Sequence, residues 1–245
     1  MTRRKIGGAL VALAALAGFG LPAGAGAFNP PEGCEAFLTV QSRGCRVSNH
    51  YRCEADAPGD QWRADFGQEG VTFLSRIDSE GQWLESYDAF PTVRQTLDAG
   101  ARDPASMTDL LVTGRDDFDF GLSKDNGVRT LVTGFDQLTG KSFVIDGITL
   151  RETEFEFTET DPQGKVLNHS WGNEFVHPEW RLFFAGPSQW NDGTDTFPTD
   201  DSPVQFVFPG EPGFGATVPI FECDVVTSSY PMSRKPMEAP ANDDL

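Results

Sequence analysis

Apolar and polar residues alternate with a period of two along much of the chain. In residues 71–77 (VTFLSRI) the odd positions are mostly apolar, and residues 117–122 (DFDFGL) place acids on one side and Phe or Leu on the other. Residues 154–157 (EFEF) repeat the same arrangement. This alternation is typical of antiparallel strands with one covered face and one face in water.

Turn signals separate these runs at short intervals. Residues 78–81, 125–127, 138–141 and 161–164 each contain a glycine that suits a positive φ or a side chain that closes its own turn. No segment has a helical period over three turns, and residues 92–99 fit a short helix or a strand equally well.

The pattern therefore predicts about a dozen short strands. The predicted fold is all-β: an antiparallel meander that forms a barrel or a two-sheet sandwich, stapled by disulfides. The tetrapeptide LVTG occurs at 111–114 and 131–134, which would mark two equivalent strands if the repeat is real. Residues 186–203, rich in Gly, Pro and Asp, predict a long loop.

Both ends of the chain differ from this pattern. Residues 1–27 have a basic start, an apolar run at 6–21 and small residues at 25–27, which together predict a secretory signal peptide. Residues 28–226 are predicted to form a single all-β domain, and 227–245 a disordered C-terminal tail. We therefore expect an exported protein, periplasmic or extracellular, that has no stable membrane anchor and begins at Phe28.

Charge narrows the range of partners. The net charge is −18, and it becomes −21 once the three basic residues of the signal peptide (Arg3, Arg4 and Lys5) are removed. A surface this acidic repels nucleic acid and anionic lipid, and we therefore expect no nucleic-acid partner. A small amphipathic molecule or a protein partner is compatible with it, and no cofactor is predicted.

All four cysteines lie in the mature part, and an even count in an oxidising compartment predicts two disulfides. Residues 45–53 predict one straight strand about 26 Å long, which excludes a Cys45–Cys53 bond. A two-residue loop at 43–44 would place Cys34 opposite Cys53, which leaves Cys45 for Cys223. The alternative, Cys34–Cys45 with Cys53–Cys223, stays open if residues 34–41 are not a strand.

Residues 167–180 (LNHSWGNEFVHPEW) concentrate two of the three histidines. Gly172 and Asn173 predict a two-residue type II′ turn between two short strands. In that register His169 shares a face with Leu167 and Trp171, whereas His177 points to the other side of the sheet and cannot share a metal with it. A three-residue loop would pair the two histidines. Leu167, His169 and Trp171 are candidate residues of a ligand cavity, with a plain structural role for His169 as the alternative.

Residues 152–156 (ETEFE) place Glu152, Glu154 and Glu156 on one face of a strand. This segment resembles the E-x-D-x-E strand of laminarinase-like hydrolases, with Glu154 in place of the central aspartate. The resemblance implies a retaining glycosidase that uses these carboxylates. The competing interpretation is a solvated strand face in an acidic chain, and we favour it.

Other catalytic motifs are missing: the sequence has no G-x-S-x-G, H-E-x-x-H, P-loop or strand-following G-x-G-x-x-G. Asp192, Asp195 and Asp200 offer oxygen ligands at a density that suits a weak Ca²⁺ site, but the spacing is not that of an EF-hand. No other metal site is predicted.

Three functions fit these observations. The first is a non-catalytic exported protein that binds a small amphipathic ligand or a partner chain in a β cavity, as 20 Phe and 5 Trp suggest. The second is a secreted carbohydrate-active hydrolase that uses the 152–156 strand. The third is a structural envelope protein without a pocket. An apolar cavity, an open acidic cleft or a filled interior would separate them. The sequence leaves the ligand, the oligomeric state and the choice between enzyme and binding protein open, and favours a protein that is not an enzyme.

Overall fold

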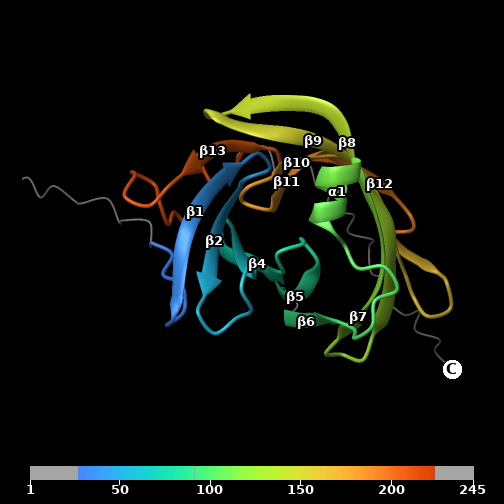
Figure 1. Ribbon diagram of the computed structural model, residues 1–245. Helices are drawn as coiled ribbons and strands as arrows, with labels where there is room; N and C mark the ends of the chain where they lie inside the picture. The colour runs from blue at the N-terminus through green and yellow to red at the C-terminus, as the bar shows by residue number, and fades with distance from the viewer. Residues whose placement is uncertain (1–26, 91, 224–245) are drawn as a thin grey trace, which may run out of the picture.

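A computed structural model describes residues 27–90 and 92–223. The predicted signal peptide, apart from Ala27, and the predicted C-terminal tail at 227–245 lie outside the described residues. Within them, 13 strands form a single sheet and one short helix accompanies it (Figure 1). The all-β prediction is therefore confirmed. None of the described helices is long and apolar enough to cross a membrane.

The elements follow one another along the chain in this order: β1 Cys34–Ser42, β2 Arg46–Cys53, β3 Gln61–Gly67, β4 Gly70–Ile77, β5 Trp83–Ala89, β6 Thr92–Leu97, α1 Met107–Thr113, β7 Arg115–Lys124, β8 Arg129–Ile145, β9 Ile148–Thr160, β10 Val166–His177, β11 Leu182–Asn191, β12 Thr196–Asp200 and β13 Pro203–Val207.

The sheet is an antiparallel meander, as the alternation predicts. Each strand from β1 to β12 pairs with the next one in sequence, and β13 returns to pair with β1 at the opposite end of the sheet. The sheet curls strongly, with β1 and β2 on one side of the outline and β7 on the other (Figure 1). The sheet is not closed, because its end strands β12 and β13 do not pair with each other.

The β13–β1 end instead packs face to face against β10 and β11. Phe175 of β10 and Phe184 of β11 share a buried core with Leu38 and Val40 of β1 and with Phe206 of β13. The rings of Phe184 and Phe206 lie 5.3 Å apart, edge to face. Apolar burial, rather than a backbone ladder, therefore holds the two ends of the sheet together.

One element, α1, is missing from the sequence-based prediction. Ser106 caps its first turn by accepting a hydrogen bond from Asp109 N, and Gly114 ends it in the left-handed region with φ 90°. These capping signals stand in the sequence, but the helix is only 7 residues long. A helix this short does not establish a periodic pattern over three turns. It buries Met107 and Leu110 toward the interior of the sheet.

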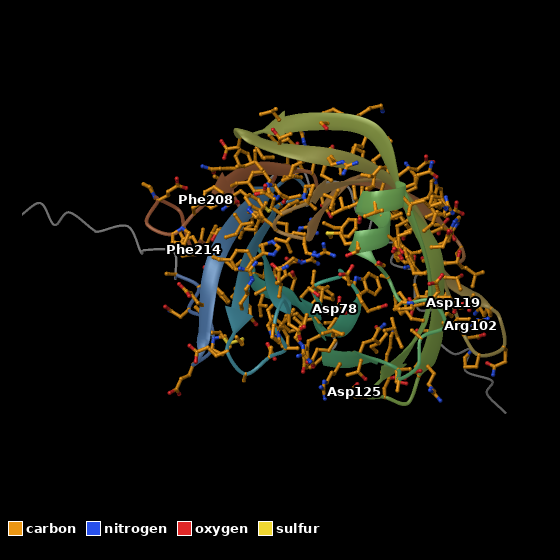
Figure 2. All side chains as sticks on the ribbon, in the orientation of Figure 1. Asp78, Arg102, Asp119, Asp125, Phe208 and Phe214 are labelled. Carbon is orange, nitrogen blue, oxygen red and sulfur yellow. A yellow bond between two sulfur atoms is a disulfide. The ribbon has the colours of Figure 1, made fainter. Side chains whose placement is uncertain are left out.

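The segment before α1 is attached to the sheet at β7. The Arg102 guanidinium pairs with the Asp119 carboxylate at 2.8 Å, and Asp103 forms an isolated bridge with Asp119 (Figure 2). The helix thereby keeps a fixed position against the curved sheet.

Three local predictions are wrong. Residues 186–203 form most of β11 and all of β12 instead of a long loop. The two LVTG copies are not equivalent strands, because the first ends α1 and the second lies in β8. Residues 138–141 are a bulge inside β8, where the register against β9 shifts between Leu138 and Ser142. The segment 92–97 is a strand.

Both predicted disulfides, Cys34–Cys53 and Cys45–Cys223, are present. The predicted register is nevertheless one residue off near the turn, since Ser42 pairs with Arg46 and the loop has three residues. A bulge between Ala36 and Leu38 removes this offset, so that Cys34 lies opposite Cys53. Two disulfides are typical of proteins that fold in an oxidising compartment.

Candidate functional site

The concave side of the sheet encloses a cavity of about 670 Å³. Its walls come from β2 to β11 and from α1. Strands contribute to it through alternate residues, so the period-two pattern of the sequence is the direct cause of the cavity lining. In Figure 2 side chains crowd the space inside the curved sheet, and the cavity lies between them.

Aromatic side chains form one wall of the cavity. The indole of Trp83 on β5 lies edge to face against Phe120 of β7 at 6.1 Å and Phe157 of β9 at 6.0 Å. The ring centroids of Phe118 and Phe120 lie 5.8 Å apart, and those of Phe155 and Phe157 lie 6.2 Å apart. We call these five residues the aromatic wall. Such ring contacts preserve a large apolar surface that still faces open space.

Three carboxyl groups continue this wall. Asp116 of β7 lies directly opposite Asp136 of β8, and Glu174 of β10 lies one strand beyond β9, opposite Thr153. All three acids line the cavity. We call Asp116, Asp136 and Glu174 the acidic row. Like charges on directly opposite residues destabilise a sheet, so the arrangement has a cost in the free protein.

The acidic row is poorly solvated, and burial is the first cause of its pKa shifts. Burial raises the pKa of Glu174 to about 7 and that of Asp116 to about 6. Burial, followed by repulsion from Glu174 and Asp116, raises the pKa of Asp136 well above its ordinary value. The backbone N–H of Ser106 donates to Asp116 at 2.8 Å, whereas no described residue forms a hydrogen bond or ion pair with the carboxyl of Asp136 or Glu174.

Two arginines reach the cavity from β2 and β3, and each already has an acidic partner. Arg63 lies 3.1 Å from the Asp65 carboxylate, and Arg46 lies 3.3 Å from Asp201. Asp65 is buried; burial opposes its ionisation, but Arg63, Arg46 and the Ser48 hydroxyl together lower its pKa. Each arginine is therefore already paired with a carboxylate outside the acidic row.

His50 of β2 lines the same cavity and is 2% exposed. Burial, reinforced by the positive charge of Arg63, lowers its pKa to about 3, so the imidazole is neutral near pH 7. Its Nδ1 atom has no hydrogen-bond partner among the described residues. A buried nitrogen without a partner is rare in folded proteins.

The three cavity candidates from the sequence lie elsewhere. Leu167, His169 and Trp171 share one face of β10, as predicted, but the cavity is lined by Asn168 and Glu174 from the same strand. The imidazole of His169 contacts the Glu156 carboxylate at 2.9 Å and packs against Trp171 at 4.6 Å, on the face away from the cavity.

The predicted hairpin at Gly172 and Asn173 does not exist either. β10 runs without a turn through Gly172, which pairs with both β9 and β11. Gly172 is needed for a close approach, since a Cβ atom there would lie 2.5 Å from the Ser188 Cα. His169 and His177 therefore lie at two ends of one strand. The turn follows His177, whose ring stacks on Trp180 at 3.8 Å.

The acids of the 152–156 strand also lie outside the cavity lining. Glu152, Glu154 and Glu156 share one face of β9, and Phe155 and Phe157 occupy the cavity face. Glu152 is buried at 7% exposure, where it accepts a hydrogen bond from the Thr139 hydroxyl at 2.8 Å and pairs with Lys141 at 3.0 Å. These contacts with Thr139 and Lys141 are structural ones on the convex face.

Two of the loop acids predicted to bind calcium accept hydrogen bonds from backbone N–H groups of their own loops. Asp192 accepts the backbone N–H groups of Thr194 and Asp195, and Asp200 accepts that of Ser202. Within residues 27–90 and 92–223, no group of three or more His, Cys, Asp or Glu side chains could hold a metal ion.

No protein-family model, no curated protein and no solved structure matches this chain. The sequence reasoning missed the acidic row. Glu174 follows polar residues on its strand face and gives no signal, whereas Asp136 interrupts a mostly apolar face of β8 between Val132 and Leu138. Such an interruption marks a residue that is buried at a cost.

Proposed function

We propose that this protein is an exported, non-catalytic binding protein that holds a small amphipathic ligand inside its curved sheet. The observation that carries the proposal is the cavity of about 670 Å³. Its volume lies within the range of roughly 300–1,000 Å³ that ligand sites occupy. Apolar and aromatic side chains together with converging polar groups are the usual lining of such sites, and this cavity combines the aromatic wall with the acidic row.

Two further features support the proposal. The disulfides Cys34–Cys53 and Cys45–Cys223 fit an exported protein, and a periplasmic or extracellular location agrees with the signal peptide expected from the sequence. The acids of the 152–156 strand lie on the convex face, which favours binding over hydrolysis by that strand. A structural protein would have no need of an unfilled interior.

The experiment is a fluorescence titration with N-phenyl-1-naphthylamine, an uncharged amphipathic probe. We expect saturable binding at one probe per chain. In Ser75→Trp a bulky ring replaces a small side chain that lines the cavity, and we expect about a tenfold or greater loss of affinity.

The matched control is Thr149→Trp, which adds the same ring at an exposed position of β9. It should bind the probe as the natural protein does. If the natural protein shows no saturable binding, or if both variants lose affinity equally, the proposal is wrong.

A further inference from the structure

The charges around the cavity do not balance. Its three basic lining residues each have an acidic partner: Arg46 pairs with Asp201, Arg63 with Asp65, and Lys124 with Glu159. The acidic row of Asp116, Asp136 and Glu174 has no basic partner within ion-pair distance among the described residues. Arg63 and Arg46 attract Glu174 without forming an ion pair with it, but acidic side chains outnumber basic ones in the lining, so the net charge inside the cavity is negative.

The acidic row and the aromatic wall are parts of one surface. Phe118 follows Asp116 by two residues on the same face of β7, and Gly134 precedes Asp136 by two residues on β8. Gly134 pairs with both Phe118 and Phe157, so it leaves room between their rings. A cation at the acidic row would thus lie beside aromatic faces, which attract positive charge.

A second observation is independent of the acids. His50 is 2% exposed, faces the cavity and carries an Nδ1 atom without a partner among the described residues. A neutral imidazole has one nitrogen that accepts a hydrogen bond. The His50 imidazole is thus a buried polar group beside the cavity whose hydrogen bonding the described residues leave incomplete.

Building on the proposed function, we propose that the ligand is a cationic amphiphile: a protonated primary amine held by Asp136 and Glu174, with its apolar body against the aromatic wall. An ammonium group offers three donors and no acceptor, which suits two carboxylates that lack hydrogen-bond donors. Charge-assisted hydrogen bonds of this kind are about twice as strong as neutral ones.

An anionic headgroup fits less well. Arg46 and Arg63 would have to give up Asp201 and Asp65 to bind it fully, and it would add negative charge to a cavity that already contains the acidic row. A cation relieves the repulsion between the acids instead, so binding removes a cost that the free protein carries.

The experiment compares three ligands with the same chain: dodecylamine, 1-dodecanol and dodecanoate, titrated below their critical micelle concentrations at pH 8 by calorimetry. We expect dodecylamine to bind about tenfold more tightly than dodecanol, and dodecanoate to bind most weakly. In the double variant Asp136→Asn/Glu174→Gln the preference for the amine over dodecanol should disappear.

The matched control is Glu154→Gln/Glu156→Gln, which removes two acids from the convex face and should keep the preference for the amine. If all three ligands bind equally, or if the cavity double variant keeps the preference, the cationic ligand is wrong and the binding protein stands. If none of the three and no N-phenyl-1-naphthylamine binds, the proposed function fails as well.

Discussion

At the scale of single residues, two buried groups respond to pH in opposite senses. Glu174 has its pKa raised from 4.5 to about 7 by burial, so the folded state holds this proton more tightly than the unfolded state does. His50 has its pKa lowered from 6.5 to about 3 by burial, so the folded state holds that proton less tightly. Linkage converts each difference into a dependence of stability on pH.

The signs follow directly. The contribution of Glu174 is fully present below pH 4.5 and is lost as pH rises through about 7. The contribution of His50 is present above pH 6.5 and is lost as pH falls toward about 3. Because the two windows overlap, the natural protein should show a flatter stability profile than either group alone would produce.

We predict that Glu174→Gln unmasks the His50 contribution. Between pH 5 and pH 8 the variant should gain about 2 kcal/mol in free energy of unfolding relative to the natural protein. The reason is that the amide at position 174 does not titrate, so the stability that the buried Glu174 carboxyl loses as pH rises is no longer lost. Urea unfolding of both proteins without added ligand at the two pH values measures this difference. Glu154→Gln, at an exposed position of β9, should change the two free energies by the same small amount. Equal stability changes for Glu174→Gln at both pH values would contradict the prediction.

At the scale of elements, some glycines are explained by the close approach of neighbouring strands and not by a turn. Gly134 lies in the middle of β8 with an ordinary φ, and Gly172 lies within β10. An added Cβ at Gly134 would meet the carbonyl oxygen of Glu156 and lie 2.7 Å from the Phe157 Cβ on the neighbouring strand. In both strands glycine permits the pairing of three adjacent strands.

We therefore predict that Gly134→Ala destabilises the protein by about 2 kcal/mol or more, because β8 and β9 have to move apart where they form the cavity wall. Thermal or urea unfolding measures the change. The comparison is Gly67→Ala, whose added Cβ would meet the Thr72 methyl group at 3.3 Å and should cost less than about 1 kcal/mol. Similar losses for the two variants would show that the close approach at Gly134 does not matter.

At the scale of the whole molecule, the two disulfides close loops of different length. Cys34–Cys53 spans 19 residues within the first hairpin, whereas Cys45–Cys223 spans 178 and ties that hairpin to the segment after β13. Chain entropy alone assigns about 3 kcal/mol to the first and about 5 kcal/mol to the second, as upper values.

The double variant Cys45→Ser/Cys223→Ser should accordingly lose more stability than Cys34→Ser/Cys53→Ser, as measured by urea unfolding of the oxidised proteins. Each variant retains the other bond and so controls for general effects of cysteine removal. A larger loss for the 34–53 pair would mean that local hairpin geometry, not loop closure, dominates.

The strands at 70–77, 115–124 and 148–160 could be predicted from sequence because alternation is local and each inward residue reports on its own burial. The disulfide pairing was also predictable, although two register errors cancelled: the loop after Ser42 is longer by one residue, and the bulge near Phe37 compensates for it. A bulge leaves no pattern in the sequence that would reveal it.

The sequence by itself determined that the chain forms an antiparallel meander and which residues share a strand face, and it favoured the observed cysteine pairing without excluding Cys34–Cys45 with Cys53–Cys223. Only the tertiary structure decided which face is concave, and so why Glu174 lines the cavity while His169 points away from it. It also brought Asp116, Asp136 and Glu174 together from three strands. The physical reason is that a period of two distinguishes the two faces of a strand without saying which one is inside, and the curl and overlap of the sheet depend on contacts between residues far apart in the chain.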